Sequence, residues 1–270
     1  MDLELENRVV VITGAGSGMG RAGALVFAGE GAQVVVADVD DAGGQATVAQ
    51  IRAGGGDALY QHCDVSNAAQ TMALAAAAVA RFGRIDVLYN NAAATTLCNR
   101  DDRPCHELPE AIWDRQHAVT LKGVYLCAKA CLPVMIQQGG GMVLNVSSID
   151  ATLAEAGFDS YTAAKGGVEA LTRSMAAYYG KHHIRVVCLR PAYVMTEVQD
   201  WVANDPEARR RIEALHLTPL GRPEDVAHVA AFVASNKARF ITGTVIDVDG
   251  GYGAFKHTGA ELSSRVESSE

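Results

Sequence analysis

Short apolar runs alternate with helical stretches along the first half of the chain. The helical stretches extend to about Glu30, then through Ala53, and then over residues 67–82. Strands that alternate with helices of roughly 10–15 residues predict βαβ units, a parallel sheet and helices on both of its faces. We expect these buried strands, rich in Val and Ile, at "RVVVIT" (8–13), "AQVVVAD" (32–38), "DALYQHCD" (57–64) and "RIDVLYNN" (84–91).

The alternation continues through the second half of the chain. The sequence shows no linker rich in Pro, Gly and Ser and no internal repeat, so residues 1–255 are predicted to form one doubly wound α/β domain. Residues 94–109 and 191–220 are expected to be loops with room for function, and 256–270 form a polar tail. Helices are expected at about Pro109 to Gln137, from about Ser160 and from Pro223, and strands at "GMVLNVSS" (141–148), "IRVVCLR" (184–190) and "GTVIDVDGG" (243–251).

Composition and charge favour a soluble globular protein without a nucleic-acid surface. Hydrophobic residues make up 49% of the chain and charged residues 20%, and the net charge is −8. Binding of a nucleic-acid backbone needs clustered Lys and Arg, which this balance disfavours. A single nucleotide remains compatible with it, because backbone amides can hold the phosphates.

The location predicted from the sequence is the cytoplasm. The N-terminus "MDLELENR" is acidic and lacks the apolar core of a secretory signal. The longest continuous apolar run, residues 72–80, is shorter than the roughly 20 residues that span a bilayer. The six cysteines are scattered without a C-x-x-C pair, which indicates reduced thiols. Cys127 and Cys131 stand four positions apart and could share a metal, but two small core residues are the simpler interpretation, so no metal is predicted.

A glycine-rich stretch, "TGAGSGMG" (13–20), follows the first strand and opens the first helix. Gly14, Gly18 and Gly20 lie where a tight turn and a close backbone approach leave no room for a Cβ atom. The free N–H groups and the positive dipole of a helix N-terminus suit a pyrophosphate. The position between a Val-rich strand and a helix therefore predicts a dinucleotide site, with a merely structural turn as the alternative.

Two acidic residues at strand ends refine the nature of the dinucleotide. Asp38 ends the second strand, where a carboxylate can accept both adenosine ribose hydroxyls and repel a 2′-phosphate. Val39 follows it and no Lys or Arg stands nearby, so we predict NAD rather than NADP. Asp64 and Val65 end the third strand and are expected to flank the adenine. Asp38 and Asp64 could each also cap the helix that follows.

With these features in order, the chain resembles the short-chain dehydrogenase/reductase family over about residues 7–253. The resemblance implies a seven-stranded Rossmann-like sheet and one active site per subunit. It also implies a homotetramer or homodimer built partly from the helices of 109–137 and 160–180. The motifs that carry it are Thr13–Gly20, Asp38, Asp64–Val65, "NNAA" (90–93), Ser148, Tyr161 with Lys165, and "PAYVMT" (191–196).

The same resemblance implies roles for individual residues. Tyr161 would be the general acid/base, Lys165 its helper and Ser148 the hydroxyl that holds the substrate oxygen. Val194 and Thr196 would meet the nicotinamide carboxamide. Asn90 would line the cofactor and stabilise the central strand. Together with Gly14, Gly18, Gly20, Asp38, Asp64 and Val65, the expected cofactor-binding residues are Ser17, Met19, Asn90, Ala92, Tyr161, Lys165, Pro191, Val194 and Thr196.

Three positions depart from the family's usual pattern. Ala93 stands where NNAG has its glycine, and Ala192 follows Pro191 where the family has Pro-Gly, so each adds a methyl group beside the cofactor. Thr120, in "HAVTLKGVYLCAK", replaces an asparagine that in the family helps to hold a water between the lysine and solvent. Thr120 is therefore included among the expected catalytic positions, with an altered proton relay as the consequence.

The chemistry of the Tyr161–Lys165 pair follows from its spacing. Residues i and i+4 share a helix face, and a nearby cation favours the phenolate form of a tyrosine whose ordinary pKa is about 10. Oxidised nicotinamide would add a second positive charge, and hydride would pass between the substrate carbon and the cofactor. The sequence therefore predicts an NAD-dependent oxidoreductase that interconverts a secondary alcohol and a ketone.

The substrate and the competing functions are less constrained. We expect a secondary alcohol or ketone of moderate size, and Asp150 to contact a polar substrate group or only solvent. The alternatives are an NADPH-dependent biosynthetic ketoreductase and a catalytically idle NAD(H)-binding sensor or scaffold. An enoyl reductase fits less well, because such enzymes space tyrosine and lysine more widely. The expected pocket residues are Ile149, Asp150, Leu153, Phe158, Tyr193, Val198 and Trp201.

Overall fold

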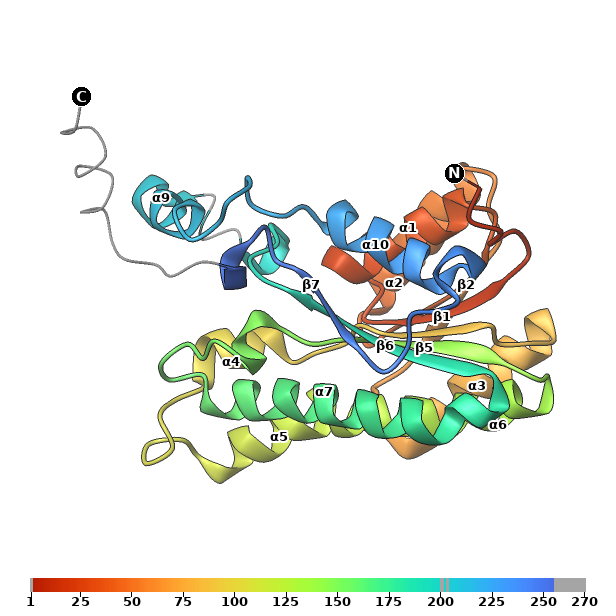
Figure 1. Ribbon diagram of the computed structural model, residues 1–270, viewed down its shortest axis with the longest axis horizontal. Coiled ribbons are helices and arrows are strands. Elements are labelled where there is room, and N and C mark those ends of the chain that lie inside the picture. The colour runs from red at the N-terminus through yellow and green to blue at the C-terminus, as the bar shows by residue number, and fades with distance from the viewer. Residues whose placement is uncertain (1, 200–201, 203, 255–270) are drawn as a thin grey trace.

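Seven parallel strands form one sheet in the order β3-β2-β1-β4-β5-β6-β7. The computed structural model describes residues 2–199, 202 and 204–254 (Figure 1). The expected doubly wound, Rossmann-like α/β fold is confirmed, and every strand pairing is parallel. The strands are β1 (Val9–Thr13), β2 (Gln33–Asp38), β3 (Ala58–His62), β4 (Val87–Asn90), β5 (Gly141–Val146), β6 (Ile184–Pro191) and β7 (Val245–Val248).

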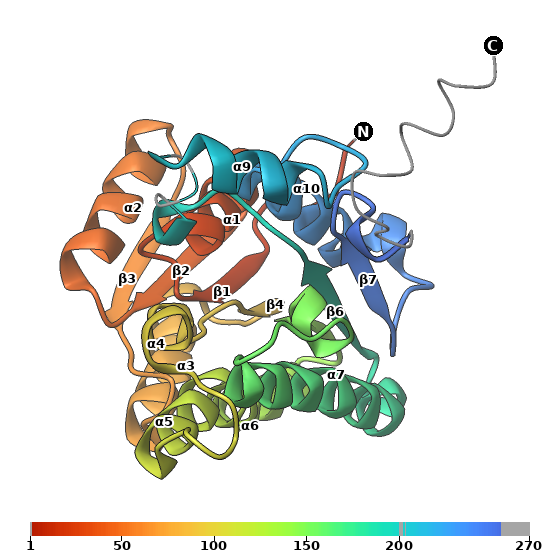
Figure 2. The ribbon, with the colours of Figure 1, turned by 90° about the vertical axis from the view of Figure 1, so that its left-hand side faces the viewer.

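Helices cover both faces of this sheet, as parallel crossovers require. One layer holds α1 (Gly18–Gly29), α2 (Asp41–Ala53) and α10 (Pro223–Ala234) (Figures 1 and 2). The opposite layer holds α3 (Ala68–Phe82), α5 (Glu110–Thr120), α6 (Lys122–Gln137) and α7 (Asp159–Tyr179).

The two layers have separate hydrophobic cores, because successive strand side chains point to opposite faces. On β1, Val10 and Ile12 pack with Phe27 of α1 on one side. Val9 and Val11 pack on the other side, with side chains of α3 and α6. All five β1 residues are buried, which explains why the strand reads as a continuous apolar run rather than an alternating one.

The sheet order reverses direction between β1 and β4, which are neighbours in the sheet although two strands, β2 and β3, separate them in the chain. At such a switch point, the loops that leave the carboxyl ends of the two strands run to opposite faces and leave a crevice. The glycine-rich stretch leaves β1 at this crevice, and the residues after Asn90 leave β4.

Three expected loop or helix assignments are wrong. Residues 94–109 contain a helix, α4 (Thr95–Asp101), and residues 191–220 contain α9 (Pro206–Glu213). The expected long helix is divided into α5 and α6 at Leu121, where φ is −108°. A Cβ atom on Gly167 would lie 2.8 Å from a Leu121 methyl, so the junction is packed closely against α7. No proline marks this junction in the sequence, and Gly123 lies two residues after it, in the first turn of α6. The predicted tail, 256–270, lies outside the described residues.

The stretch Glu110–Gln137 contains an 18-residue window with a mean hydropathy of 1.5, and it is long and apolar enough to cross a membrane by length and composition alone. In the fold it is the α5–α6 pair. Cys127, Cys131, Leu132 and Met135 of α6 are buried in the core beneath the sheet. Its apolar character is therefore that of a core helix. The two cysteines that could have shared a metal are part of this packing.

Candidate active site

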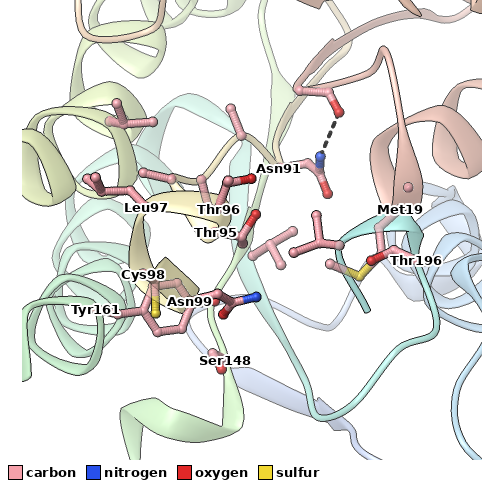
Figure 3. Close-up of a pocket in the computed structure, with 18 of the residues that line it drawn as sticks. Met19, Asn91, Thr95, Thr96, Leu97, Cys98, Asn99, Ser148, Tyr161 and Thr196 are labelled. Atoms are coloured by element: carbon pink, nitrogen blue, oxygen red, sulfur yellow. Dashed lines mark hydrogen bonds between the residues drawn. The ribbon is translucent and has the colours of Figure 1, made fainter. Parts of the chain in front are cut away.

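A cleft of about 770 Å³ opens at the carboxyl ends of the strands, where the sheet order reverses (Figure 3). Its walls come from the glycine-rich stretch, the ends of β2 and β3, the β4–α4 connection with α4, the segment after β5, the start of α7, and residues 191–199. These segments lie far apart in the sequence and meet only in the fold. The cleft therefore contains most of the predicted dinucleotide residues together with Ser148, Tyr161 and Lys165.

The glycine-rich stretch is shaped for a close approach to a ligand. Gly14 and Gly18 have positive φ values of 64° and 49°, which side chains rarely adopt. A Cβ atom on Gly14 would lie 2.9 Å from the Ala92 Cα atom, and one on Gly20 would lie 2.0 Å from the Gly14 carbonyl oxygen. Gly14 and Gly18 line the cleft, whereas Gly20 packs behind it against Gly14 and Asn91.

An acidic side chain already lies at the N-terminus of α1. Glu197 accepts a hydrogen bond from the Gly18 amide at 3.1 Å and forms an ion pair with Arg21 at 2.9 Å. A carboxylate on these donors stands in for an anionic group such as a phosphate, which the free amides and dipole of a helix N-terminus attract. The residues present therefore fit a dinucleotide at this end of the cleft.

Asp38 lies at the end of β2, beside the glycine-rich stretch. Its Oδ2 atom accepts from the Gly16 amide at 2.7 Å and its Oδ1 atom from the Asp40 amide at 2.9 Å, so the carboxylate is held at the cleft wall. It does not cap the next helix, because the Asp40 side chain does so. Asp64 and Val65 also line the cleft, and the cap of α3 is Asn67 rather than Asp64.

Ser148, Tyr161 and Lys165 line the same cleft, and Figure 3 shows Ser148 near Tyr161. Ser148 follows β5, while Tyr161 and Lys165 lie on successive turns of α7. The Lys165 Nζ atom donates to the Val146 carbonyl oxygen at 2.8 Å and lies 5.6 Å from the Tyr161 ring centroid. The Ser148 hydroxyl donates to Asp150 Oδ2 at 2.9 Å.

Burial dominates the electrostatics of this group. It raises the pKa of the Tyr161 phenol well above its usual range, and the charge of Asp150 adds to the effect. It also lowers the pKa of Lys165 to about 8. The predicted lowering of the phenol pKa needs the charge of an oxidised nicotinamide as well as that of Lys165, so it remains a prediction for the cofactor-bound protein. The ammonium group is itself destabilised, and it does not outweigh the loss of water around the hydroxyl.

The first turn of α7 is held by a residue that the sequence analysis missed. Asp102, only 4% exposed, accepts from the Tyr161 amide at 2.9 Å and from the Ser160 amide and hydroxyl at 3.2 and 2.8 Å. It follows α4, within the segment flagged as a functional loop. Nothing in the local sequence distinguishes Asp102 from its neighbour Asp101, so this contact was visible only in the fold.

Thr120 and Asn90 lie behind the cleft rather than in it. The Thr120 hydroxyl oxygen accepts from the Ala94 amide at 3.2 Å and from Gln116 Nε2 at 2.9 Å, which ties α5 to the β4–α4 connection. Asn90 is buried, and its Nδ2 atom donates to Asn145 on β5 at 2.9 Å. Asn90 is not among the residues that line the cleft, whereas Asn91 lines it and donates to the Gly14 carbonyl oxygen at 3.1 Å.

Most of the remaining predicted residues line the cleft. Trp201 lies outside the described residues, and Leu153 is an exposed side chain away from the cleft wall. Other wall residues were not predicted, because they lie on the unexpected helix α4 or reach the cleft only through contacts between distant segments. They are Asn91, Thr95, Leu97, Cys98, Asn99, Arg115 and Glu155. The predicted residues that do line the cleft also include Ser17, Met19, Ala92, Ile149, Asp150, Phe158, Pro191, Tyr193, Val194, Thr196 and Val198.

Comparison with known proteins decides the family. A family model described as Enoyl-(Acyl carrier protein) reductase matches residues 14–253. A probable short-chain type dehydrogenase/reductase of Bradyrhizobium diazoefficiens is 41% identical over 247 residues, which cover 91% of this chain and 87% of that protein. The chain belongs to the short-chain dehydrogenase/reductase family.

Two further members of the family are similar over most of their lengths. A cis-4-hydroxycyclohexanecarboxylate dehydrogenase of Sinomonas cyclohexanicum is 41% identical over 249 residues, covering 92% of this chain and 97% of that protein. The solved structure of a 7α-hydroxysteroid dehydrogenase, in complex with NADH and 7-oxo glycochenodeoxycholic acid, has a TM-score of 0.86 and 30% identity. The match covers 93% of this chain and 96% of that one.

Proposed function

We propose that this short-chain dehydrogenase/reductase interconverts a secondary alcohol and a ketone with NAD as the cofactor and Tyr161 as the general acid/base. The relatives of the chain support an oxidoreductase of this family that acts on alcohols or ketones. The observation that carries the finer proposal is the meeting of Ser148, Tyr161 and Lys165 with the glycine-rich stretch in one cleft.

The choice of NAD rests on Asp38. Its carboxylate is fixed by two backbone amides at the cleft wall, where it can accept the ribose hydroxyls of an adenosine. The negative charge would oppose the additional phosphate of NADP. Val39 follows Asp38 in the cleft wall, and two arginines at this end of the cleft are already paired, Arg21 with Glu197 and Arg115 with Asp64. The structural relative bound to NADH is consistent with the same preference.

The roles of the residues follow from their positions. The nicotinamide, when bound, accepts or supplies the hydride at the substrate carbon. In alcohol oxidation, the Tyr161 oxygen takes the hydroxyl proton of the substrate; in ketone reduction, it returns that proton to the carbonyl oxygen. Ser148 contacts the same substrate oxygen. Lys165, held against the Val146 carbonyl, supplies positive charge that favours the phenolate once the cationic cofactor adds to it.

Three alternatives are distinguishable from this proposal. An NADPH-dependent ketoreductase would need a phosphate-binding cation near Asp38. A catalytically idle sensor would have no reason to bury Lys165 beside Tyr161. Enoyl reduction, suggested by the description of the matching family model, is disfavoured by the four-residue spacing of Tyr161 and Lys165.

A panel of secondary alcohols assayed with NAD and with NADP tests the proposal directly. We expect formation of NADH with at least one member of the panel and a clear preference for NAD in kcat/KM. A many-fold preference for NADP would contradict the cofactor assignment. Tight NADH binding without turnover of any alcohol, or of the corresponding ketones in the reverse direction, would favour the sensor.

A further inference from the structure

Two carboxylates line the part of the cleft that lies beyond the catalytic hydroxyls. Asp150 belongs to the short 3-10 helix Ile149–Ala151 that follows Ser148, and Glu155 lies in the connection between this helix and α7. Both are cleft-wall residues, as are Tyr161 and Ser148. Asp150 is in direct contact with Ser148, and Glu155 lies five residues further along the chain, so the pair borders the space around the reacting groups.

Each carboxylate is held by a hydroxyl of another cleft residue. Ser148 donates to Asp150 at 2.9 Å, and the Tyr193 hydroxyl donates to Glu155 Oε2 at 3.2 Å. Each of the two side chains has a second carboxylate oxygen, and a carboxylate can accept several hydrogen bonds. The two side chains therefore keep the capacity to accept hydrogen bonds from a bound molecule.

The negative field of the pair extends across this end of the cleft. Burial raises the pKa of Asp150, and the charge of Glu155 raises it further. Burial also raises the pKa of Tyr193, and after it Glu155 and Asp150 contribute. Glu155 therefore lies close enough to Asp150 to affect its charge, and both carboxylates lie close enough to affect Tyr193.

The cations of the described cleft wall do not neutralise this pair. Arg115 lies 3.2 Å from Asp64, at the end of β3, on the side of the predicted adenine site. Lys165 donates to Val146, and its charge offsets part of that of Asp150, but it forms no ion pair with either carboxylate among the described residues. A substrate carboxylate placed near Asp150 and Glu155 would meet like charge, whereas an ammonium or hydroxyl group would meet acceptors.

We propose that Asp150 and Glu155 are specificity-determining residues, which select substrates that carry a hydrogen-bond donor, an ammonium or a hydroxyl group, beyond the reacting carbon and which reject substrates with a carboxylate there. This inference rests on the proposed function. By their names, two relatives of the chain act on or bind acids. For a substrate with a carboxylate, this inference and a simple transfer of the relatives' activities therefore predict opposite results.

The test uses one ring skeleton with four substituents: 4-aminocyclohexanol, 1,4-cyclohexanediol, 4-methylcyclohexanol and 4-hydroxycyclohexanecarboxylate, at a pH where the amine is protonated and at saturating NAD. We expect kcat/KM to be highest for the donor-bearing alcohols. For the carboxylate it should be lower by about ten-fold or more, as like charges at short range require. The methyl compound separates donor recognition from simple size. Any member that is not oxidised is measured as a competitive inhibitor of an alcohol that is.

Variants of the intact protein locate the effect. Glu155→Gln and Asp150→Asn should each reduce the ratio of kcat/KM between the ammonium and carboxylate substrates several-fold. Glu197→Gln is the matched control, because it removes a carboxylate from the opposite, glycine-rich end of the same cleft, and this ratio should not change. Added salt should also reduce this ratio in the parent protein, because salt screens exposed charges such as that of Glu155.

The outcomes separate the inference from the proposed function. A preference for the carboxylate substrate, or a ratio that neither Glu155→Gln nor Asp150→Asn changes, would overturn the inference while leaving the dehydrogenase activity in place. Absence of turnover with every alcohol of the broader panel would contradict the proposed function itself, and the inference would fall with it.

Discussion

Lys165 is a charged residue that the fold keeps almost entirely from water, at 2% exposure. Its four-residue spacing from Tyr161 was readable in the sequence, because helix geometry is local. The electrostatic result was not readable, since the pKa of each group depends on everything packed around it. Burial raises the pKa of Tyr161 and lowers that of Lys165, so the unliganded pair resists ionisation in both members.

We expect Lys165→Met to stabilise the unliganded protein at pH 7 while abolishing turnover. A lysine pKa lowered from 10.5 to about 8 in the folded state costs about 3 kcal/mol at neutral pH, against about 1 kcal/mol for the lost bond to Val146. The cost is fully present below about pH 8 and disappears as pH rises through the ordinary lysine pKa.

Denaturant unfolding from pH 7 to pH 10 measures this effect as the difference in unfolding free energy between the two proteins. The advantage of Lys165→Met should shrink steadily over this range. Lys181→Met, which changes a lysine outside the cleft, should show no such trend. An unchanged or growing advantage at pH 10 would contradict the account of Lys165.

At the scale of elements, the strands and most helices were predictable, because continuous apolar runs and glycine positions report on local structure. The break at Leu121, helix α4 and the anchoring of α7 were not. Each depends on contacts between segments distant in sequence, such as Leu121 against Gly167 or Asp102 against Ser160. Ser148, Tyr161 and Lys165 were predicted to act together and do line one cleft, but the elements that hold them in place were missed.

Asp102 should position Tyr161 by holding the start of α7. Asp102→Ala leaves the amides of Ser160 and Tyr161 and a buried hydroxyl without their acceptor, so we expect a loss of about 2 kcal/mol or more in stability. We also expect kcat to fall by about ten-fold or more, because small displacements of a catalytic group are costly.

The positioning role predicts a specific pattern of kinetics. The Kd for NADH should change little in Asp102→Ala, and Asp102→Asn, which keeps an acceptor, should recover part of kcat. Asp101→Ala, at the neighbouring residue, is the control and should match the parent protein. A loss of stability with normal kcat at a temperature where the variant is folded would contradict the positioning role.

Glu197 should compete with the cofactor for the start of α1. It occupies the Gly18 amide and pairs with Arg21, both at the end of the cleft where a pyrophosphate is expected. We expect Glu197→Gln to lower the Kd for NADH by roughly three- to ten-fold, because a like charge is removed at a partly exposed position.

Titration of NADH by fluorescence measures that Kd. Glu207→Gln, which removes an exposed carboxylate paired with Arg211 on α9, serves as the matched control. A weaker affinity for NADH in Glu197→Gln would mean that the carboxylate supports cofactor binding instead.

At the scale of the whole molecule, α5 and α7 lie side by side on the outer surface of one layer (Figure 2). This layer carries partly exposed aromatic side chains, among them Trp113 at 37%, Tyr125 at 47% and Tyr178 at 57%. Exposed aromatic residues of this kind are enriched at protein interfaces. The homotetramer or homodimer expected from the sequence remains a prediction, and these helices are where we expect contact between copies of the chain.

Sedimentation measures that prediction. The parent protein should sediment as a dimer or tetramer, and combining Trp113→Glu with Tyr178→Glu should shift it to smaller species. Met72→Glu, at an exposed position of α3, is the control. A monomeric parent protein, or an oligomer unaffected by the double substitution, would contradict the placement of the interface.

The central claim is that Tyr161 transfers the proton in NAD-linked oxidation of a secondary alcohol. It is tested most directly by comparing Tyr161→Phe with the parent protein, using an alcohol oxidised in the panel. We predict that kcat falls by about a thousand-fold or more while the Kd for NADH stays within about two-fold, because only the reacting hydroxyl is removed. A variant that retains most of its turnover, with NADH still bound normally, would contradict the account.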